Sequence, residues 1–156
     1  MFIPQKNLLN MKKIFLVPAV LAAIMAFSTQ TFAQKKEKDK VLANKTYTVE
    51  ITETSAKKPK TVNDEISFKS EKLNSKFMAS EHHFQPGPYV VAVDSTSDPK
   101  TISFVSEAKN PDSATIKWEG TIADETIEGT ATITTKKGKE TQYSFTGSLK
   151  AKPGKK

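Results

Sequence analysis

From Thr46 onward, apolar and polar residues alternate along the chain with a period of two. Tyr47, Val49 and Ile51 open the pattern, with threonine and glutamate between them. Further apolar sets follow at Ile66 and Phe68, at 73–78, at Tyr89, Val91 and Val93, at Ile102 and Phe104, at Ile116, Trp118 and Ile122, at Ile127, Ala131 and Ile133, and at Tyr143, Phe145 and Leu149. Such alternation is typical of strands with one buried and one solvated face. The pattern predicts eight short strands and no dependable helix after residue 45.

Short polar segments rich in turn residues separate these strands, as at 85–88, 95–99 and 137–139. Short connections favour antiparallel pairing of successive strands. Eight strands in such a meander can close on themselves, which leaves no unpaired edge. We therefore expect an all-β protein with a single antiparallel eight-stranded up-and-down barrel over residues 46–149. A β-sandwich is the alternative, with 55–63 as its one candidate crossing connection.

The residues before the predicted barrel have the order of a secretory signal peptide. Two lysines follow Met11, residues 14–27 are apolar, and 28–33 form a short stretch that ends on Ala33. This order predicts that residues 1–33 are removed before Gln34 and that the product is periplasmic or extracellular. Met11 is a better start for this signal than Met1, so we expect translation to begin at Met11 and residues 1–10 to be a mis-assigned start. A run of 14 residues is shorter than the ~20 that a spanning helix needs, so we expect no stable membrane anchor.

Charge is concentrated at the two ends of the predicted mature chain. Residues 34–45 and 150–156 are rich in lysine, and we expect both to be solvated, disordered tails. Residues 46–149 hold 12 lysines and 15 acidic residues, a net charge of −3 (12 − 15). A nucleic-acid-binding domain places basic residues on its folded surface, and arginine, which is absent here, makes the forked contacts to phosphate. We therefore expect no nucleic-acid partner.

The last three predicted strands allow a prediction of register. A two-residue turn at 124–125 places Gly120 opposite Gly129 and Trp118 opposite Ala131. Matching apolar phases across the next hairpin then places Gly129 beside Gly147. It also pairs Ala131 with Phe145 and Ile133 with Tyr143. The expected result is an inward row of three glycines next to a row formed by Trp118, Ala131 and Phe145.

This glycine row has two interpretations. Glycines in strands mark sharp bends of a barrel. They can also leave room for a ligand against the neighbouring aromatic rings. The residues that would line such a ligand site are Tyr47, Phe68, Trp118, Gly120, Gly129, Tyr143, Phe145 and Gly147.

The chain resembles small exported calycin-type barrels in its predicted export and its meander of strands. It also resembles them in the segment Trp118-Glu119-Gly120 and in the closing segment 143–149. That group includes lipocalins, fatty-acid-binding proteins and avidins. The chain departs from lipocalins in having no Gly-x-Trp on its first predicted strand and no arginine near its last. The resemblance implies that a small apolar molecule binds inside the barrel, and no binding residue transfers by motif.

Catalytic chemistry has little support in the sequence. There is no cysteine and no Gly-x-Ser-x-Gly motif. His82 and His83, if extended, would point to opposite faces, and no third residue stands at metal-ligand spacing. We expect no enzyme activity, no metal and no cofactor. The leading hypothesis is an exported barrel that binds a small hydrophobic molecule, and the alternative is a structural or protein-interaction domain with a filled core. The oligomeric state is left open.

Overall fold

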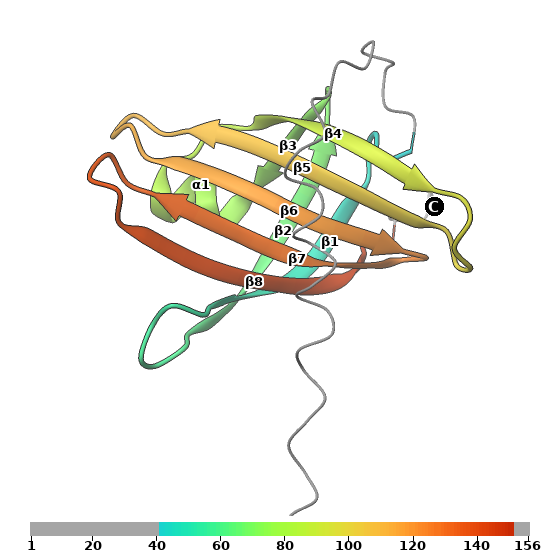
Figure 1. The fold of residues 1–156 in the computed structure, drawn as a ribbon, viewed down its shortest axis with the longest axis horizontal. Helices are drawn as coiled ribbons and strands as arrows, with labels where there is room; N and C mark the ends of the chain where they lie inside the picture. Colours follow the sequence, from blue (N-terminus) through green and yellow to red (C-terminus); the bar gives the residue numbers. More distant parts are fainter. Residues whose placement is uncertain (1–40, 152–156) are drawn as a thin grey trace, which may run out of the picture. The chain divides into compact units, whose positions relative to one another are not determined.

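The structure, a computed structural model, describes residues 41–151, and the predicted signal peptide lies outside this range. The described chain forms eight antiparallel strands and one short helix, and the strands follow one another around a closed barrel (Figure 1). The elements are β1 (Thr46–Glu53), β2 (Thr61–Lys69), β3 (Lys72–Ser75), α1 (Lys76–His82), β4 (Gly87–Asp94), β5 (Thr101–Lys109), β6 (Thr115–Ala123), β7 (Thr126–Thr134) and β8 (Glu140–Leu149). Pairing of β1 with β8 closes the ring. The predicted all-β up-and-down barrel is thereby confirmed, in place of the β-sandwich.

The core fills the inside of this ring, and its residues follow the predicted period of two. In β1, for example, Tyr47, Val49 and Ile51 are buried, and the residues between them face outward. Leu42, four residues before β1, is also fully buried. The range 34–45 was expected to be a lysine-rich tail, and Leu42 shows that the folded part includes residues before Thr46. The apolar side chain of Leu42, not the surrounding charge, decides its position.

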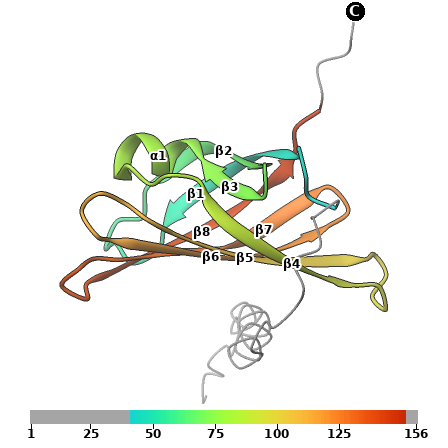
Figure 2. The same ribbon diagram turned by 90° about the horizontal axis from the view of Figure 1, so that it is seen from above.

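The barrel has its shortest ladder between β3 and β4. Only Lys72 with Pro88 and Leu73 with Gly87 are paired there, whereas β4 pairs with β5 from Tyr89 to Asp94. β3 has only four residues, between the turn at Ser70 and Glu71 and the start of α1 after Ser75. In this antiparallel register, the residues of β4 after Pro88 lie beyond the N-terminal end of β3. Most of β4 therefore extends past β3, as Figure 2 shows.

The helix α1 was not expected, and the strand predicted over 73–78 is wrong in its second half. Ser75 has an extended backbone and its hydroxyl accepts a hydrogen bond from the Met78 N–H at 3.0 Å. This is the geometry of a helix N-cap. The helix ends at His82, and the next residue, His83, is its C-cap with a left-handed φ of 57°. Within residues 41–151, no helix is both long and apolar enough to cross a membrane.

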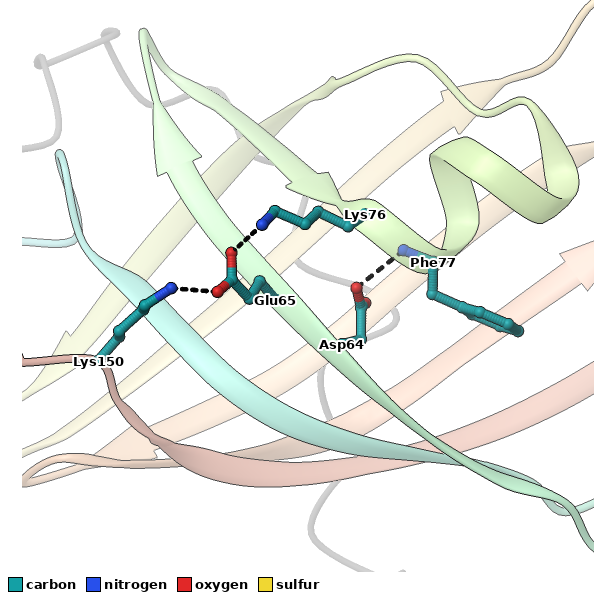
Figure 3. A network of polar contacts seen from close by, with 5 residues as sticks. All are labelled: Asp64, Glu65, Lys76, Phe77 and Lys150. Carbon is teal, nitrogen blue, oxygen red and sulfur yellow. Dashed lines mark hydrogen bonds and ion pairs between the residues drawn. The ribbon is translucent and has the colours of Figure 1, made fainter.

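A buried carboxylate ties α1 to β2 (Figure 3). Asp64 on β2 is 5% exposed. One of its oxygens accepts the Phe77 N–H at 2.8 Å and the other accepts the Ser75 hydroxyl at 2.5 Å. The first turn of a helix has N–H groups without intrahelical partners, and Asp64 satisfies one of them from a neighbouring strand. Asp64 thus sets where the strand stops and the helix starts.

The next residue of β2, Glu65, forms ion pairs with Lys76 and Lys150 on the outer surface (Figure 3). Hydrogen bonds from Lys150 and then Lys76 lower the pKa of Glu65 from 4.5 to about 2. Lys150 was assigned to the solvated C-terminal tail, and it instead contacts the barrel. Residues 152–156 of that predicted tail lie outside the described residues.

Replacing Asp64 tests its role in holding α1. Asp64→Ala leaves the Phe77 N–H and the Ser75 hydroxyl without their acceptor. We expect the free energy of unfolding to fall by about 1–3 kcal/mol, the usual effect of an unsatisfied buried polar group. Urea denaturation would measure it. Asp112→Ala, at an exposed turn position, is the control and should change stability little. An equal loss in both variants would contradict the role given to Asp64.

The low pKa of Glu65 predicts an acid-dependent contribution to stability. Because the folded-state pKa is below the ordinary value, the contribution is fully present above about pH 4.5 and is lost as the pH falls toward about 2. NMR titration of the Glu65 carboxyl group should give this low pKa. In Lys150→Gln it should move back toward 4.5, and an unchanged value would show that Lys150 is not its cause.

Candidate functional site

Four of the five predicted aromatic site residues lie in one continuous cluster inside the barrel. Tyr47 and Phe68 are in edge-to-face contact, with ring centroids 6.1 Å apart. Trp118 and Phe145 are 5.5 Å apart. Phe104, which was not among the predicted site residues, joins the two pairs, at 5.2 Å from Phe68 and 6.4 Å from Phe145. The apolar phase of β5 already placed Phe104 inside, but its central position depends on the tertiary structure.

The fifth, Tyr143, is buried elsewhere. Its ring packs against Phe77 and His82 of α1, with centroids 6.3 Å and 6.0 Å away. Its hydroxyl lies 3.4 Å from Nε2 of His82. Burial lowers the pKa of His82 and raises the pKa of Tyr143, the latter helped by the charge of Glu53. Both groups are therefore held uncharged near neutral pH. Sequence reasoning missed this contact because it did not predict the helix.

The two histidines occupy the end of α1 and not a strand. His82 is the last helical residue and His83 is the C-cap. His83 has a left-handed backbone, and the ring of His82 packs against Phe77 and Tyr143. Among residues 41–151, no group of three or more histidine, cysteine, aspartate or glutamate side chains is placed to hold a metal ion.

The predicted glycine row is correct for two glycines and wrong for the third. Gly120 faces Gly129 and Trp118 faces Ala131, as expected. On β8, however, Gly129 faces Phe145, Ala131 faces Tyr143, and Ile133 faces Thr141. Gly147 lies opposite Ile127 on one side and Val49 on the other. The three glycines share a phase but do not form a straight row.

The turn between β7 and β8 explains the error. The hairpin closes through Thr135 and Lys139, whose N–H···O distance is 2.9 Å, around a three-residue loop that ends in Gly138. Gly138 has a φ of 80°, which glycine adopts without strain. The predicted register requires Gly138 at the centre of the hairpin instead. A shift of two residues keeps every side chain on its face, so the apolar pattern could not distinguish the two registers.

No open space remains beside these glycines. A Cβ atom built on Gly120 would lie 2.6 Å from the ring of Phe104, and one on Gly129 would lie 2.7 Å from the ring of Phe145. Each phenylalanine stands directly opposite its glycine on the neighbouring strand. The ring of each phenylalanine therefore covers the neighbouring glycine. This supports the interpretation of the glycines as bends and not as the border of a ligand cavity.

The cavity lined by Trp118 is very small. It lies between the indole, β3, α1 and neighbouring residues and has a volume of about 10 Å³. That is at the lower limit for a single water molecule. A larger groove of about 350 Å³ lies next to residues 85–88 and 107–109 and opens to solvent. None of the eight predicted site residues lines this groove.

Within the part of the chain that the structure describes, one buried side-chain polar atom has no hydrogen-bond partner. Tyr47 is fully buried, and its hydroxyl forms no hydrogen bond with any described residue. Burial, with a smaller effect from Glu125, raises its pKa to about 12. The hydroxyl is thus a neutral donor in an aromatic environment. A buried hydroxyl without a partner is uncommon and usually needs a specific explanation.

The space beside Gly129 gives a sharp test of the filled interior. In Gly129→Ala, the new methyl group would lie 2.2 Å from the Glu119 carbonyl oxygen as well as against the Phe145 ring. We expect the free energy of unfolding to fall by at least about 1–3 kcal/mol through overpacking. Thermal or urea denaturation would measure it.

Gly138→Asn is the matched control. Nothing lies within 4 Å of a Cβ at Gly138, and asparagine tolerates a left-handed backbone. This variant should remain close to the original stability. If Gly129→Ala were equally well tolerated, there would be free space at the centre of the barrel.

The chain was compared with family models, curated proteins and solved structures. No family model, no curated protein and no solved structure matches it. The closed, antiparallel eight-stranded barrel is compatible with a calycin-like architecture.

Proposed function

We propose that this protein is an exported, non-catalytic barrel of the calycin type that acts as a structural or protein-interaction domain, with its interior filled by its own side chains. This was the alternative hypothesis from the sequence, and it now has better support than the binding of a small hydrophobic molecule. Export rests on the predicted signal peptide.

The main support for the proposal is that the rings of Phe104 and Phe145 cover the two inward glycines. The positions expected to leave room for a ligand, Gly120 and Gly129, have phenylalanine rings 2.6 Å and 2.7 Å from where a Cβ would stand. Small barrels of eight strands are commonly filled in this way. A protein without interior space is left with its outer surface for recognition. The outward phase, with its threonine, lysine and glutamate residues, is then the functional face.

A second candidate function, binding of a small apolar molecule, has one observation in its favour. The unpartnered hydroxyl of Tyr47 could donate a hydrogen bond to an acceptor atom of such a molecule. Binding would require the rings of Phe68, Phe104 and Phe145 to move apart, since they now occupy the interior. The cost of opening this packed cluster makes it the weaker candidate.

The fluorescence of Trp118, the chain's single tryptophan, distinguishes the two functions. We expect fatty acids and apolar dyes to leave the Trp118 emission unchanged. Phe145→Ala is the positive control, because it removes the ring 5.5 Å from the indole and should create a cavity that such probes enter. A saturable change of emission in the unmodified protein, weakened by Tyr47→Phe, would refute the filled-core proposal and favour the second candidate.

A further inference from the structure

Among the strands of the described residues, none pairs with most of the outer edge of β4. Val90 to Asp94 pair with β5 on one side. On the other side, β3 reaches only Gly87 and Pro88. Within residues 41–151, no other strand pairs with this edge. Figure 2 shows the β4–β5 hairpin extending beyond the short β3.

The hydrogen-bonding groups on this edge can be assigned to particular residues. The Tyr89 N–H points away from β5 and toward the Glu71 carbonyl oxygen, at 3.4 Å. In an antiparallel strand, alternate residues direct both backbone groups to the same side. The N–H and C=O groups of Val91 and Val93 therefore also point away from β5. An exposed row of this kind is a template for pairing with another strand.

The side chains of β4 favour such pairing. Val90 and Val93 are 48% and 49% exposed, and with Val41 they are the exposed large hydrophobic residues of the described chain. No charged residue stands between Gly87 and Val93, although the chain is rich in lysine. Proteins commonly protect edge strands with lysine or proline. After Pro88, β4 has no lysine or proline, and its first charged residue is Asp94.

We propose that β4 pairs antiparallel with β4 of a second copy of this chain, with Ala92 facing Ala92 across a two-fold axis. In this register Val91 faces Val93 of the second copy, and each such pair exchanges two backbone hydrogen bonds. The interface is self-complementary, as two-fold symmetry requires. The inference rests on the proposed function, since it names a partner for the outer surface.

Charge also favours a second copy in this register. Asp94 faces Val90 of the other chain, so no like charges are opposed. Residues 34–40 of the same chain are a poor alternative, because they contain no apolar residue that could cover Val90 or Val93. The edge is short, so we expect a dimer that dissociates on dilution.

Sedimentation velocity over a dilution series of the purified protein tests the proposal. We expect a concentration-dependent equilibrium between one and two chains. Val93→Lys places a charge on the edge and should weaken dimerisation by about tenfold or more. Val93→Pro should also weaken it, because it removes an N–H that points away from β5 and leaves the β4–β5 ladder intact. Circular dichroism would confirm that both variants are folded.

Thr146→Lys is the matched control. It adds the same charge to β8, on a strand that is paired on both sides and next to Glu50 and Glu128. This variant should dimerise like the original protein. A monomer at all concentrations, or a dimer that Val93→Lys and Val93→Pro leave unchanged, would overturn the proposal.

Hydrogen exchange at the Val91 and Val93 amides identifies what covers the edge. Protection that appears only at concentrations where dimers form supports pairing between copies. Protection independent of concentration would assign the edge to a segment of the same chain. Protection induced only by an added extended apolar peptide would assign it to a different partner. Either of the last two results would overturn the dimer without affecting the filled core, which Trp118 fluorescence tests separately.

Discussion

Pairing between β1 and β8 joins the first and last strands of the meander, and the other packing relations in the barrel follow from it. β1 pairs with β2 on one side and β8 on the other, from Tyr47 with Leu149 to Glu53 with Tyr143. At Gly147 the approach is so close that a Cβ would lie 2.0 Å from the Thr48 carbonyl oxygen. Any other residue would push the two backbones apart. Closure therefore depends on glycine at this position, a role that differs from the ligand-lining role first considered for it.

Closing the ring leaves a small interior that large rings must fill. Two inward glycines, Gly120 and Gly129, allow the sheet to bend, and the phenylalanine opposite each one covers the gap. Pairing a glycine with an aromatic residue across strands is a known way to compensate for the missing side chain. The same arrangement that bends the barrel thus removes the space in which a ligand could bind. This is the physical link between the closed fold and the function that we propose for the outer surface.

The helix α1 ends β3 and contacts β8. Asp64 captures the start of the helix, so β3 ends at Ser75 after only four residues. The helix in turn brings His82 and Phe77 against Tyr143. Among the described residues, no strand pairs with the outer side of β4 beyond Tyr89, whose N–H points to the Glu71 carbonyl oxygen. The edge at Val91 and Val93, which we propose as the dimer interface, has a different origin: it lies beyond the N-terminal end of β3, where the chain turns back to β2 at Ser70 and Glu71.

The alternation of apolar and polar residues determined the all-β class, the eight strands and the inward phase of every predicted site residue, because burial of one face acts on each strand locally. Together with the short connections it favoured the barrel over a β-sandwich. The pairing of Gly120 with Gly129 also followed from the sequence, because a two-residue turn at 124–125 allows only one register of the two strands. Only the tertiary structure decided the register of β8, because a shift of two residues preserves the apolar face and a positive φ at Gly138 sets the turn. It also decided the helix after Ser75, whose N-terminus depends on Asp64 from a different strand. The filling of the interior was likewise undetermined by sequence, because it depends on how Phe104 and Phe145 orient across strands that are far apart in the chain.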